Sequence, residues 1–395
     1  MDEFSEKDGD NIEIEEMEGD QEFIQEVGFK DKLGQYLGRF SKRQKAVGVI
    51  LITTAIILIL AIFILIPLTS TEKYTRYYYI QAEEITWNYT PQGRNVVEDR
   101  DFDLYEQQYT TQQNNRIGSN YKKARFIGYI DDNFESPLES IDAEAHLGLL
   151  GPIIRAQVGD TLIIKVSNTL DKDISFFISG LLDEDHPTGA VVPSGSIISF
   201  NITISETDGP SATGFSSIPY SYYSTYDVVT DFNTGLAGAV VITKEGAGGE
   251  DAIPEDVDFE AFLMASTFDE NLSYYIEDNI NQYLLFNSSI DNAAFYESNR
   301  KYSFNGYLYG NMPMIELYEN QRVRWYILSL GEGTHTLSWS GQTILSNNER
   351  LGSMVVIPGT SQVADMIPLK SEQILRVDSY GVDFANGMTT LYTVS

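Results

Sequence analysis

Residues 195–204 read GSIISFNITI, and the alternation in this stretch decides the fold class. Four apolar residues, at 198, 200, 202 and 204, are separated by single polar ones. Because successive side chains of a β-strand point to opposite faces, the pattern predicts a strand with one buried face and one solvent face. Asn201 would then point outward.

The same alternation recurs along the chain. It is found in QVGDTLIIKVSN, at Leu162, Ile164 and Val166, and in QRVRWYILSL, which begins at Gln321. Many short strands separated by turn signals predict an all-β protein built from β-sandwiches. A stretch rich in Gly, Pro and acid predicts a linker at 246–256, between domains at 76–245 and 257–395.

Residues 46–68, AVGVILITTAIILILAIFILIPL, contain no charged side chain. As a helix they would span about 34 Å, enough for the hydrocarbon core of a bilayer. This predicts a single transmembrane helix ahead of the β domains. Six bases lie within 29–45 and only two just after the span, so the positive-inside rule places the N-terminus in the cytosol. We expect a single-pass type II protein of the plasma membrane or another secretory-pathway membrane.

The segment before this span has two parts. Residues 1–28 are strongly acidic, with twelve acids and one lysine in the first 26, which predicts a disordered cytosolic tail. Residues 29–45 combine basic residues with apolar ones at helical spacing, which predicts an amphipathic juxtamembrane segment. It would either lie on an anionic inner leaflet or serve only as a topology signal.

Composition excludes several function classes. The formal net charge is −32, and residues 46–395 account for −26 of it, so the surface repels phosphate backbones and we expect no nucleic-acid partner. The chain has no cysteine, which excludes disulfides, thiolate catalysis and iron–sulfur clusters. It also lacks the G-x-S-x-G, P-loop and H-E-x-x-H motifs.

Several segments, in order, resemble one known family over nearly all of 76–395. They are RYYYIQAEEITWNY (76–89), HLGLLGPIIRAQVGDT (146–161), YYSTYDVVTDFNTGLAGAVVIT (222–243), FDENLSYYIEDNI (268–280), ESNRKYSFNGYLYGNMP (297–313) and VRWYILSLGEGTHTLSWSGQ (323–342). Together they resemble the ceruloplasmin, hephaestin and coagulation-factor A-domain family of multicopper oxidases. The resemblance implies two plastocyanin-like cupredoxin domains, each a Greek-key β-sandwich.

The copper ligands of that family are largely missing. A blue-copper site needs two histidines and a cysteine thiolate, and the family's trinuclear cluster needs many more histidines. This chain has three histidines and no cysteine, so the counts exclude both sites within one chain. Where the oxidases have H-S-H-G-like and Y-H-S-H-like motifs, residues 177–180 read FISG and residues 222–225 read YYST. The tyrosines there would either fill the vacated space or form a new contact surface.

Two weaker metal candidates remain. The resemblance places His335 at a ligand histidine, and Asp378, Asp383 and Met388 at the blue-copper Cys, His and axial positions. His335, Asp378 and Asp383 could hold a harder ion, or His335 could be an ordinary histidine of a core strand.

The acidic loop DEDHPTG (183–189) is the second candidate. Some family members bind calcium in a longer form of this loop, and calcium favours carboxylates. Asp183, Glu184 and Asp185 would be its ligands here, or plain surface acids. We expect no resident cofactor and no copper, and keep calcium as a candidate ion.

Four N-x-S/T sequons follow the predicted span, at Asn88, Asn201, Asn271 and Asn287. They predict glycosylation on the extracellular or lumenal side. The sequence as a whole predicts a non-enzymatic ectodomain of two copper-free cupredoxin domains that binds a protein partner, with a homo-oligomer among the alternatives. The rival hypothesis is a ferroxidase-like subunit in iron or copper homeostasis that acts with a copper-bearing homologue.

Overall fold

A computed structural model describes residues 41–69, 72–113, 115–139, 141–181, 189–284 and 293–395. Within 41–69, the side chains of residues 45, 49 and 59–69 lie outside this description. The chain divides into two compact units, Met1–Thr71 and Glu72–Ser395, and each is described by itself. The acidic tail 1–28 and most of the juxtamembrane segment 29–45 lie outside the described residues.

The first unit contributes one described helix, α2 (Lys42–Thr69), which includes the predicted span 46–68. Ser41 and Gln44 cap its start reciprocally, each side chain accepting from the other's backbone N–H at 3.3 and 2.9 Å. In the described ranges, no helix is both long and apolar enough to cross a membrane. The prediction of a helix over 46–68 is confirmed by α2. The membrane span that we predicted for this helix is not shown.

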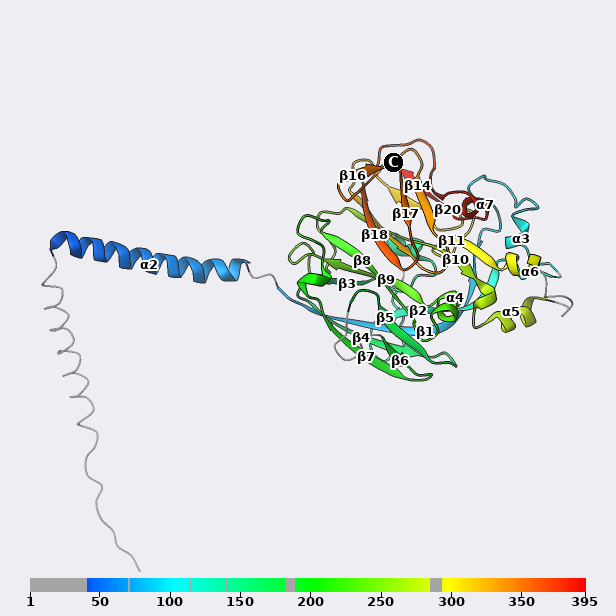
Figure 1. The fold of residues 1–395 in the computed structure, drawn as a ribbon, viewed down its shortest axis with the longest axis horizontal. Coiled ribbons are helices and arrows are strands. Elements are labelled where there is room, and N and C mark those ends of the chain that lie inside the picture. The colour runs from blue at the N-terminus through cyan, green and yellow to red at the C-terminus, as the bar shows by residue number, and fades with distance from the viewer. Residues whose placement is uncertain (1–40, 70–71, 114, 140, 182–188, 285–292) are drawn as a thin grey trace, which may run out of the picture. The chain divides into compact units, whose positions relative to one another are not determined.

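The second unit begins with a β-sandwich. One of its sheets has the spatial order β2 (Asn120–Tyr129), β1 (Thr75–Asn88), β4 (Thr161–Asn168) and β7 (Ile197–Thr203). The other has the order β3 (Ile154–Gln157), β9 (Ala237–Thr243), β8 (Ser217–Tyr223), β5 (Ile174–Ile178) and β6 (Ala190–Val192) (Figure 1). One apolar cluster draws residues from both sheets, including Ile164 and Val240, so the sheets face each other across a shared core.

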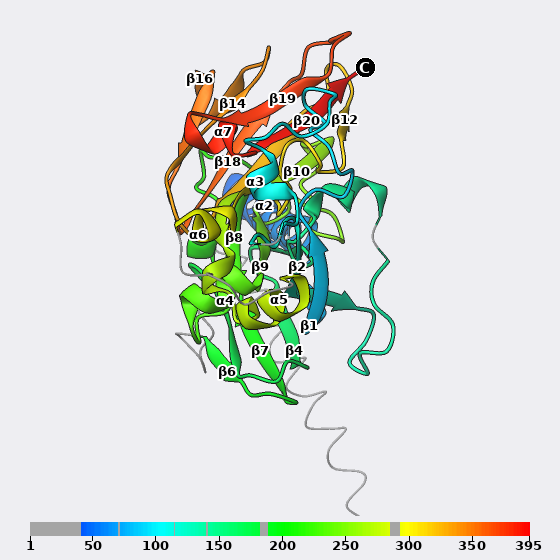
Figure 2. The same ribbon diagram turned by 90° about the vertical axis from the view of Figure 1, so that its right-hand side faces the viewer.

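The later strands repeat this arrangement. One sheet has the order β11 (Arg300–Phe304), β10 (Phe259–Asp269), β13 (Val323–Ser329), β18 (Thr360–Met366), β15 (Ile344–Ser346) and β16 (Glu349–Leu351). The other has the order β12 (Ile315–Leu317), β20 (Thr389–Val394), β19 (Leu375–Ser379), β14 (His335–Trp339) and β17 (Ser353–Val356). In both halves the first strand pairs in parallel with the fourth, β1 with β4 and β10 with β13. Figure 2 shows the second sandwich above the first.

Short helices connect these strands. They are α3 (Gln107–Thr110), η1 (Asp142–Leu147), η2 (Glu206–Asp208), α4 (Val228–Thr234), η3 (Glu270–Leu272), α5 (Ile276–Tyr283), α6 (Ala293–Ser298) and α7 (Val382–Ala385). The connection that carries α3 starts in the first sandwich but lies beside α6 of the second half (Figure 2). Both sandwiches thus belong to one compact unit, Glu72–Ser395. The domain boundaries 76–245 and 257–395 remain a prediction.

The stretch that indicated the fold behaves as expected. In β7, Phe200 and Ile202 are buried, and Ile204 just beyond it is buried too, whereas Asn201 is exposed. β4 follows the same rule, with Leu162 and Ile164 buried. The prediction of mainly β structure is confirmed.

β13 departs from that rule, because all seven of its residues are buried. Trp325 packs into the second sandwich, while Tyr326 and Leu328 on the other face join a third apolar cluster between the two sandwiches. β9 is likewise buried along its whole length. Strands at this junction are covered on both faces, so the alternation predicted for β13 describes only one of its two environments.

Candidate functional site

His335, the retained ligand position, begins β14 and is 1% exposed. Its Nδ1 lies 2.9 Å from Oδ2 of Asp383 in α7, and Ser379 Oγ donates to the same oxygen at 3.3 Å. His335 Nε2 is buried without a hydrogen-bond partner among the described residues. The structure therefore brings together two of the three predicted ligands as one hydrogen-bonded pair.

Asp378, the third candidate, lies on the opposite face of the sheet. Residues directly opposite in a sheet share a face, and Asp378 is opposite Ser338, whereas Ser379 is opposite Leu337. Leu337 is two residues from His335 in β14, so both side chains lie on the buried face. Asp378 instead accepts from Thr389 Oγ1 at 2.6 Å and lies 3.4 Å from Arg376 Nε.

These residues do not fit a blue-copper centre. The thiolate position is a carboxylate on the wrong face, and the second histidine position is a carboxylate hydrogen-bonded to His335. Met388, at the axial position, is completely buried in the second core. No group of three or more His, Asp or Glu side chains within the described ranges is arranged to hold a metal ion.

The first-sandwich copper motifs are occupied by packed aromatic side chains. Tyr222 is fully buried, its ring centroid lies 5.1 Å from that of Phe176, and its hydroxyl donates to the Pro152 carbonyl at 2.8 Å. A Cβ on Gly238 would lie 2.2 Å from the Tyr222 ring, so glycine at that position makes room for the tyrosine. At two of the former histidine positions, Phe177 and Tyr223 pack against each other instead, with ring centroids 5.7 Å apart.

The neighbouring polar residues form a closed network. Ser224 Oγ donates to Oδ2 of the buried Asp231 at 2.5 Å, and Ser175 N donates to Ser224 Oγ at 2.9 Å. Ser175 and Thr225 hydroxyls lie 2.9 Å apart, and Lys172 Nζ is 3.1 Å from Asp231 Oδ1. Thr225, at a former histidine position, thus bonds to a network of hydroxyls that ends in one ion pair.

An apolar cleft lies beside these positions, at the junction of the two sandwiches. We call it the junction cleft; it has a volume of about 490 Å³. Its apolar wall consists of Tyr223, Val228, Val229, Phe232, Leu272 and Leu330. Asp269 and Glu332 also line it, and none of its described lining residues is basic. Sequence reasoning missed this cleft because its walls come from segments far apart in the chain.

His146, in the family-like HLGLLGP segment, joins the two halves. Its Nε2 accepts the N–H of Phe262 in β10 at 3.0 Å, and its carbonyl accepts from Asn305 Nδ2 at 2.7 Å. Burial lowers the pKa of His146 to about 4, so the imidazole is neutral at neutral pH and can accept this bond. The role of this histidine is structural.

Buried charges also brace the junction. Lys123 in β2 pairs with Glu270 in η3, both fully buried, and Lys123 also donates to the Asn233 carbonyl at 2.7 Å. The amine of Lys301 donates to three backbone carbonyls, those of Tyr109, Gly118 and Ser298, at 2.6, 2.8 and 2.7 Å. Burial lowers the pKa of both lysines, that of Lys301 to about 7. Lowered pKa values are typical of nucleophilic lysines, but these amines are enclosed and bonded within the fold.

The predicted glycosylation sites differ in their surroundings. Asn201 is exposed on β7, and Asn88 ends β1. The amide of Asn271 donates to Asp269 Oδ1 at 2.6 Å and to the Tyr296 carbonyl at 2.8 Å, so it is engaged within the fold. Asn287 lies outside the described residues, as do Asp183, Glu184 and Asp185 of the candidate calcium loop.

Comparison with known proteins gives concordant results. A family model described as multicopper oxidase matches residues 146–247. Ferroxidase HEPHL1 of Homo sapiens is 34% identical over 343 residues, covering 81% of this chain and 29% of that protein. Hephaestin of Mus musculus is 32% identical, covering 81% and 29%. Ceruloplasmin of Homo sapiens is 32% identical, covering 82% and 33%. The chain thus spans about a third or less of the length of these relatives.

Solved structures show the same fold. A copper nitrite reductase from Nitrosomonas europaea superposes with a TM-score of 0.53 at 14% identity, covering 81% of this chain and 94% of that chain. A multicopper oxidase superposes with a TM-score of 0.52 at 12% identity, covering 82% and 93%. The fold is therefore the cupredoxin-like fold of multicopper oxidases.

Proposed function

The chain belongs to the multicopper oxidase superfamily, and from this premise we propose that it is a copper-free member that works by binding a protein. In this proposal the two sandwiches form an ectodomain, and residues 46–68 anchor it in a membrane with the N-terminus in the cytosol. The protein is not an oxidase by itself.

The observation that carries the proposal is the replacement of the first-sandwich copper motifs by a packed core next to a cleft. Tyr223, at a former histidine position, packs against Phe177 at another and also lines the junction cleft. Val228 and Val229, which follow in the same segment, are each 51% exposed. Adjacent exposed apolar side chains beside a concave surface are typical of protein-interaction sites.

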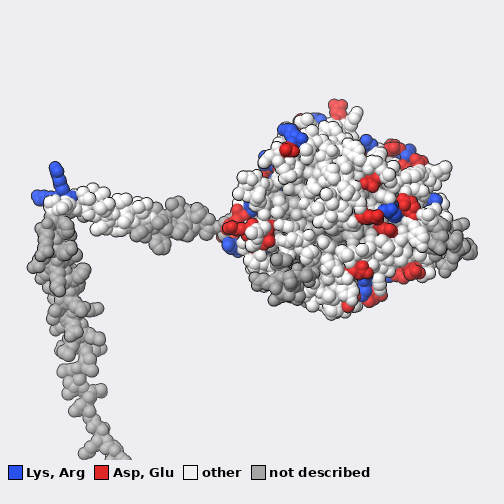
Figure 3. All heavy atoms as spheres, viewed as in Figure 1, with Lys and Arg blue, Asp and Glu red and all other residues white. Residues whose placement is uncertain are grey.

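Charge indicates the chemistry of the partner. Acidic side chains are spread over the face shown in Figure 3, and Asp269 and Glu332 line the cleft itself. A partner with an apolar group for the cleft and a basic rim would match both features. A second copy of this chain would bring more negative charge, so we expect a different protein on this surface.

The test uses the full chain in cells, with two matched valine variants. Val229→Asp places a charge in the junction cleft, and Val191→Asp places one on exposed β6, outside the residues that line it. We expect cross-linking to one defined partner to be lost in the first variant and kept in the second. Equal cross-linking by both variants would refute binding at the cleft, and recovery of the chain itself would indicate a homo-oligomer.

The membrane anchor needs its own support. α2 covers the uncharged segment 46–68, and the basic residues concentrate on its N-terminal side. We expect the chain to stay with membranes after alkaline carbonate extraction. Protease added outside intact cells should digest the sandwiches of a type II protein, whereas protease added outside sealed vesicles of the secretory pathway should leave them intact. A reversed arrangement would give the opposite results.

A ferroxidase-like role is the second candidate. It is favoured by a relative whose printed name is ferroxidase, of which this chain spans 29%. Because this chain lacks the copper ligands, a copper-bearing homologue would have to supply them. Metal analysis of the purified full chain separates the two proposals. Stoichiometric copper with an intense thiolate-to-copper absorption band in a complex with such a homologue would favour the oxidase.

A further inference from the structure

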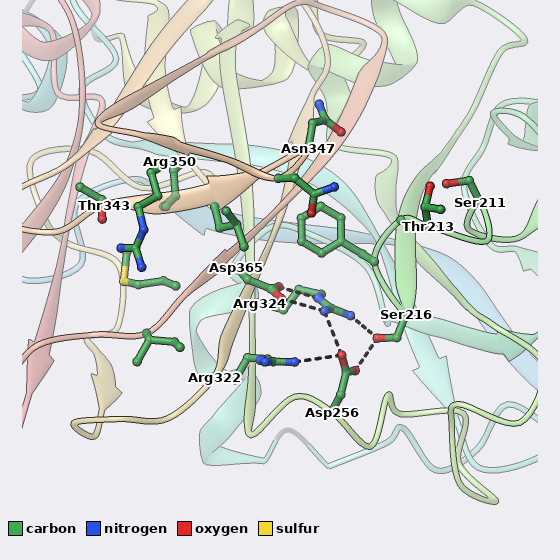
Figure 4. Close-up of a pocket in the computed structure, with 17 residues that line it drawn as sticks. Ser211, Thr213, Ser216, Asp256, Arg322, Arg324, Thr343, Asn347, Arg350 and Asp365 are labelled. Atoms are coloured by element: carbon green, nitrogen blue, oxygen red, sulfur yellow. Dashed lines mark hydrogen bonds and ion pairs between the residues drawn. The ribbon is translucent and has the colours of Figure 1, made fainter.

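A polar pocket of about 460 Å³ lies between a loop of the first sandwich and the edge of the second. The residues from the first sandwich are within 211–216, and most of the others come from β13, β15, β16 and β18 or from positions next to them (Figure 4). Three arginines line it, Arg322, Arg324 and Arg350, against two acids, Asp256 and Asp365. Residues 72–395 contain eleven arginines in a strongly acidic sequence, so three in one pocket is a marked local excess of positive charge.

Arg324 forms the fixed floor of this pocket. Its side chain is 1% exposed, and its Nε and Nη2 donate to the two oxygens of Asp365 at 2.7 and 2.9 Å. Its Nη1 donates to the hydroxyls of Ser216 and Ser217 at 2.5 and 2.8 Å. Ser216 in turn donates to Asp256. All three nitrogens of the Arg324 guanidinium donate hydrogen bonds, so this side chain links the two sandwiches and has few donors left for a ligand.

Arg350 and Arg322 remain able to bind. The exposed Arg350 side chain has no hydrogen bond or ion pair with any described residue, and in Figure 4 it carries no dashed line. The Arg322 side chain is 47% exposed and has a single 3.3 Å contact with Asp256. Leaving an arginine unpaired is unexpected in a chain with 58 acids and 26 bases, and it leaves the donors of Arg350 available to an anion.

Neutral donors border the same space. Asn347 and Asn348 are the two residues of a tight turn between β15 and β16, with φ of 49° and 64°. Asparagine tolerates this left-handed backbone, so the turn holds its amides at a defined place. Asn347 and Thr213 lie across the pocket from the Arg324 network in Figure 4 and make no side-chain hydrogen bond within the described residues. Arginines, amides and a hydroxyl together form a site rich in hydrogen-bond donors.

We infer that this pocket binds a compact organic anion through a carboxylate or phosphate group, with Arg350 and Arg322 as its charged contacts. Paired oxygens of either group match the donor fork of arginine. The volume lies in the range of small-molecule sites and exceeds the need of an inorganic ion. The surrounding charge of −26 over residues 46–395 repels an extended polyanion, so the ligand is small. This site is separate from the junction cleft and from the former copper positions.

The test is titration calorimetry on the full chain in detergent, at low salt, with four probes. Citrate carries the carboxylate chemistry, glycerol 3-phosphate the organic phosphate, inorganic phosphate is the ion alone, and glycerol is the uncharged control. We expect citrate or glycerol 3-phosphate to bind, and the one that binds identifies the group. Affinity should fall as salt rises, because the contacts are ionic.

Variants of single arginines then locate the anion-binding site. Arg350→Gln should weaken binding at least tenfold, and Arg322→Gln should weaken it as well. Arg376→Gln is the matched control, because Arg376 is 41% exposed and pairs with Asp378 away from the pocket. Binding of inorganic phosphate alone, no binding of any anion, or equal weakening in the Arg376→Gln control would each overturn the inference. None of these outcomes bears on partner binding at the junction cleft.

Discussion

Nδ1 of His335 and Oδ2 of Asp383 lie 2.9 Å apart, and this contact ties the first residue of β14 to α7. Two positions that resemble copper ligands have become a hydrogen-bonded pair, while Asp378 lies on the other face of the sheet. The pair stabilises the end of the second sandwich.

Removing either member of this pair should lower stability. We expect His335→Ala or Asp383→Asn to reduce the free energy of unfolding by about 1–3 kcal/mol, because each removes the hydrogen bond between a buried histidine and a half-buried carboxylate. Asp378→Asn should cost less, since its ion pair with Arg376 is partly exposed. Chemical denaturation measures the three values, and metal content should not change in any variant. A larger loss for Asp378→Asn would show that the outer face matters more.

The packing of Tyr222 against Gly238 should show strong coupling. Gly238→Ala places a Cβ 2.2 Å from the Tyr222 ring, so we expect a loss of several kcal/mol, at least the 1–3 kcal/mol typical of overpacking. Tyr222→Phe removes one hydrogen bond and should cost about 1 kcal/mol. In a Tyr222→Ala background, Gly238→Ala should be much less harmful than alone. Additive losses in this double-mutant cycle would contradict the close contact.

His146 should make stability depend on pH. Its pKa is about 4 in the folded chain and 6.5 when exposed, so between these values the unfolded chain binds a proton that the folded chain does not. The free energy of unfolding therefore falls as the pH is lowered from about 6.5 to 4, by up to about 3 kcal/mol for this group. Carboxylates titrate nearby, so the readout is the difference between the natural chain and His146→Gln. We expect a flatter profile for the variant, and parallel profiles would disprove this role.

The buried Lys123–Glu270 pair should tolerate joint replacement better than single replacement. Glu270→Gln alone leaves a buried lysine uncompensated and should cost about 3–5 kcal/mol. The double variant Lys123→Met with Glu270→Leu should recover much of that loss, because no buried charge remains. Thermal unfolding of the single and double variants tests this. A double variant no more stable than Glu270→Gln would mean that the pair itself is essential to the junction.

Glycan attachment should differ between two sequons. Asn201 is exposed on β7, where a bulky glycan meets no obstacle, whereas the Asn271 amide donates two hydrogen bonds within the fold. We expect Asn201→Gln to remove a glycan-sized mass from protein expressed in secretory cells and Asn271→Gln to leave the mass unchanged. No glycan at any sequon would argue against the extracellular or lumenal placement of the sandwiches.

The sequence by itself determined the strand character of the chain. The period-two pattern of residues 195–204 is local, and β7 follows it because one sheet face packs on a core while the other meets solvent. Counts of histidine and cysteine sufficed to exclude complete copper sites within this chain. The ordered motifs sufficed to identify the superfamily, since they reflect the whole fold rather than any one contact.

The tertiary structure decided which residues meet. The pairing of β14 with β19 sets Asp378 apart from His335, a fact of register that the spacing of residues in the sequence does not contain. Burial of β13 on both faces depends on the other sandwich, so its alternation gave only half of its environment. The junction cleft and the arginine pocket likewise combine segments more than 100 residues apart. Local periodicity fixes secondary structure, but such sites arise from long-range packing.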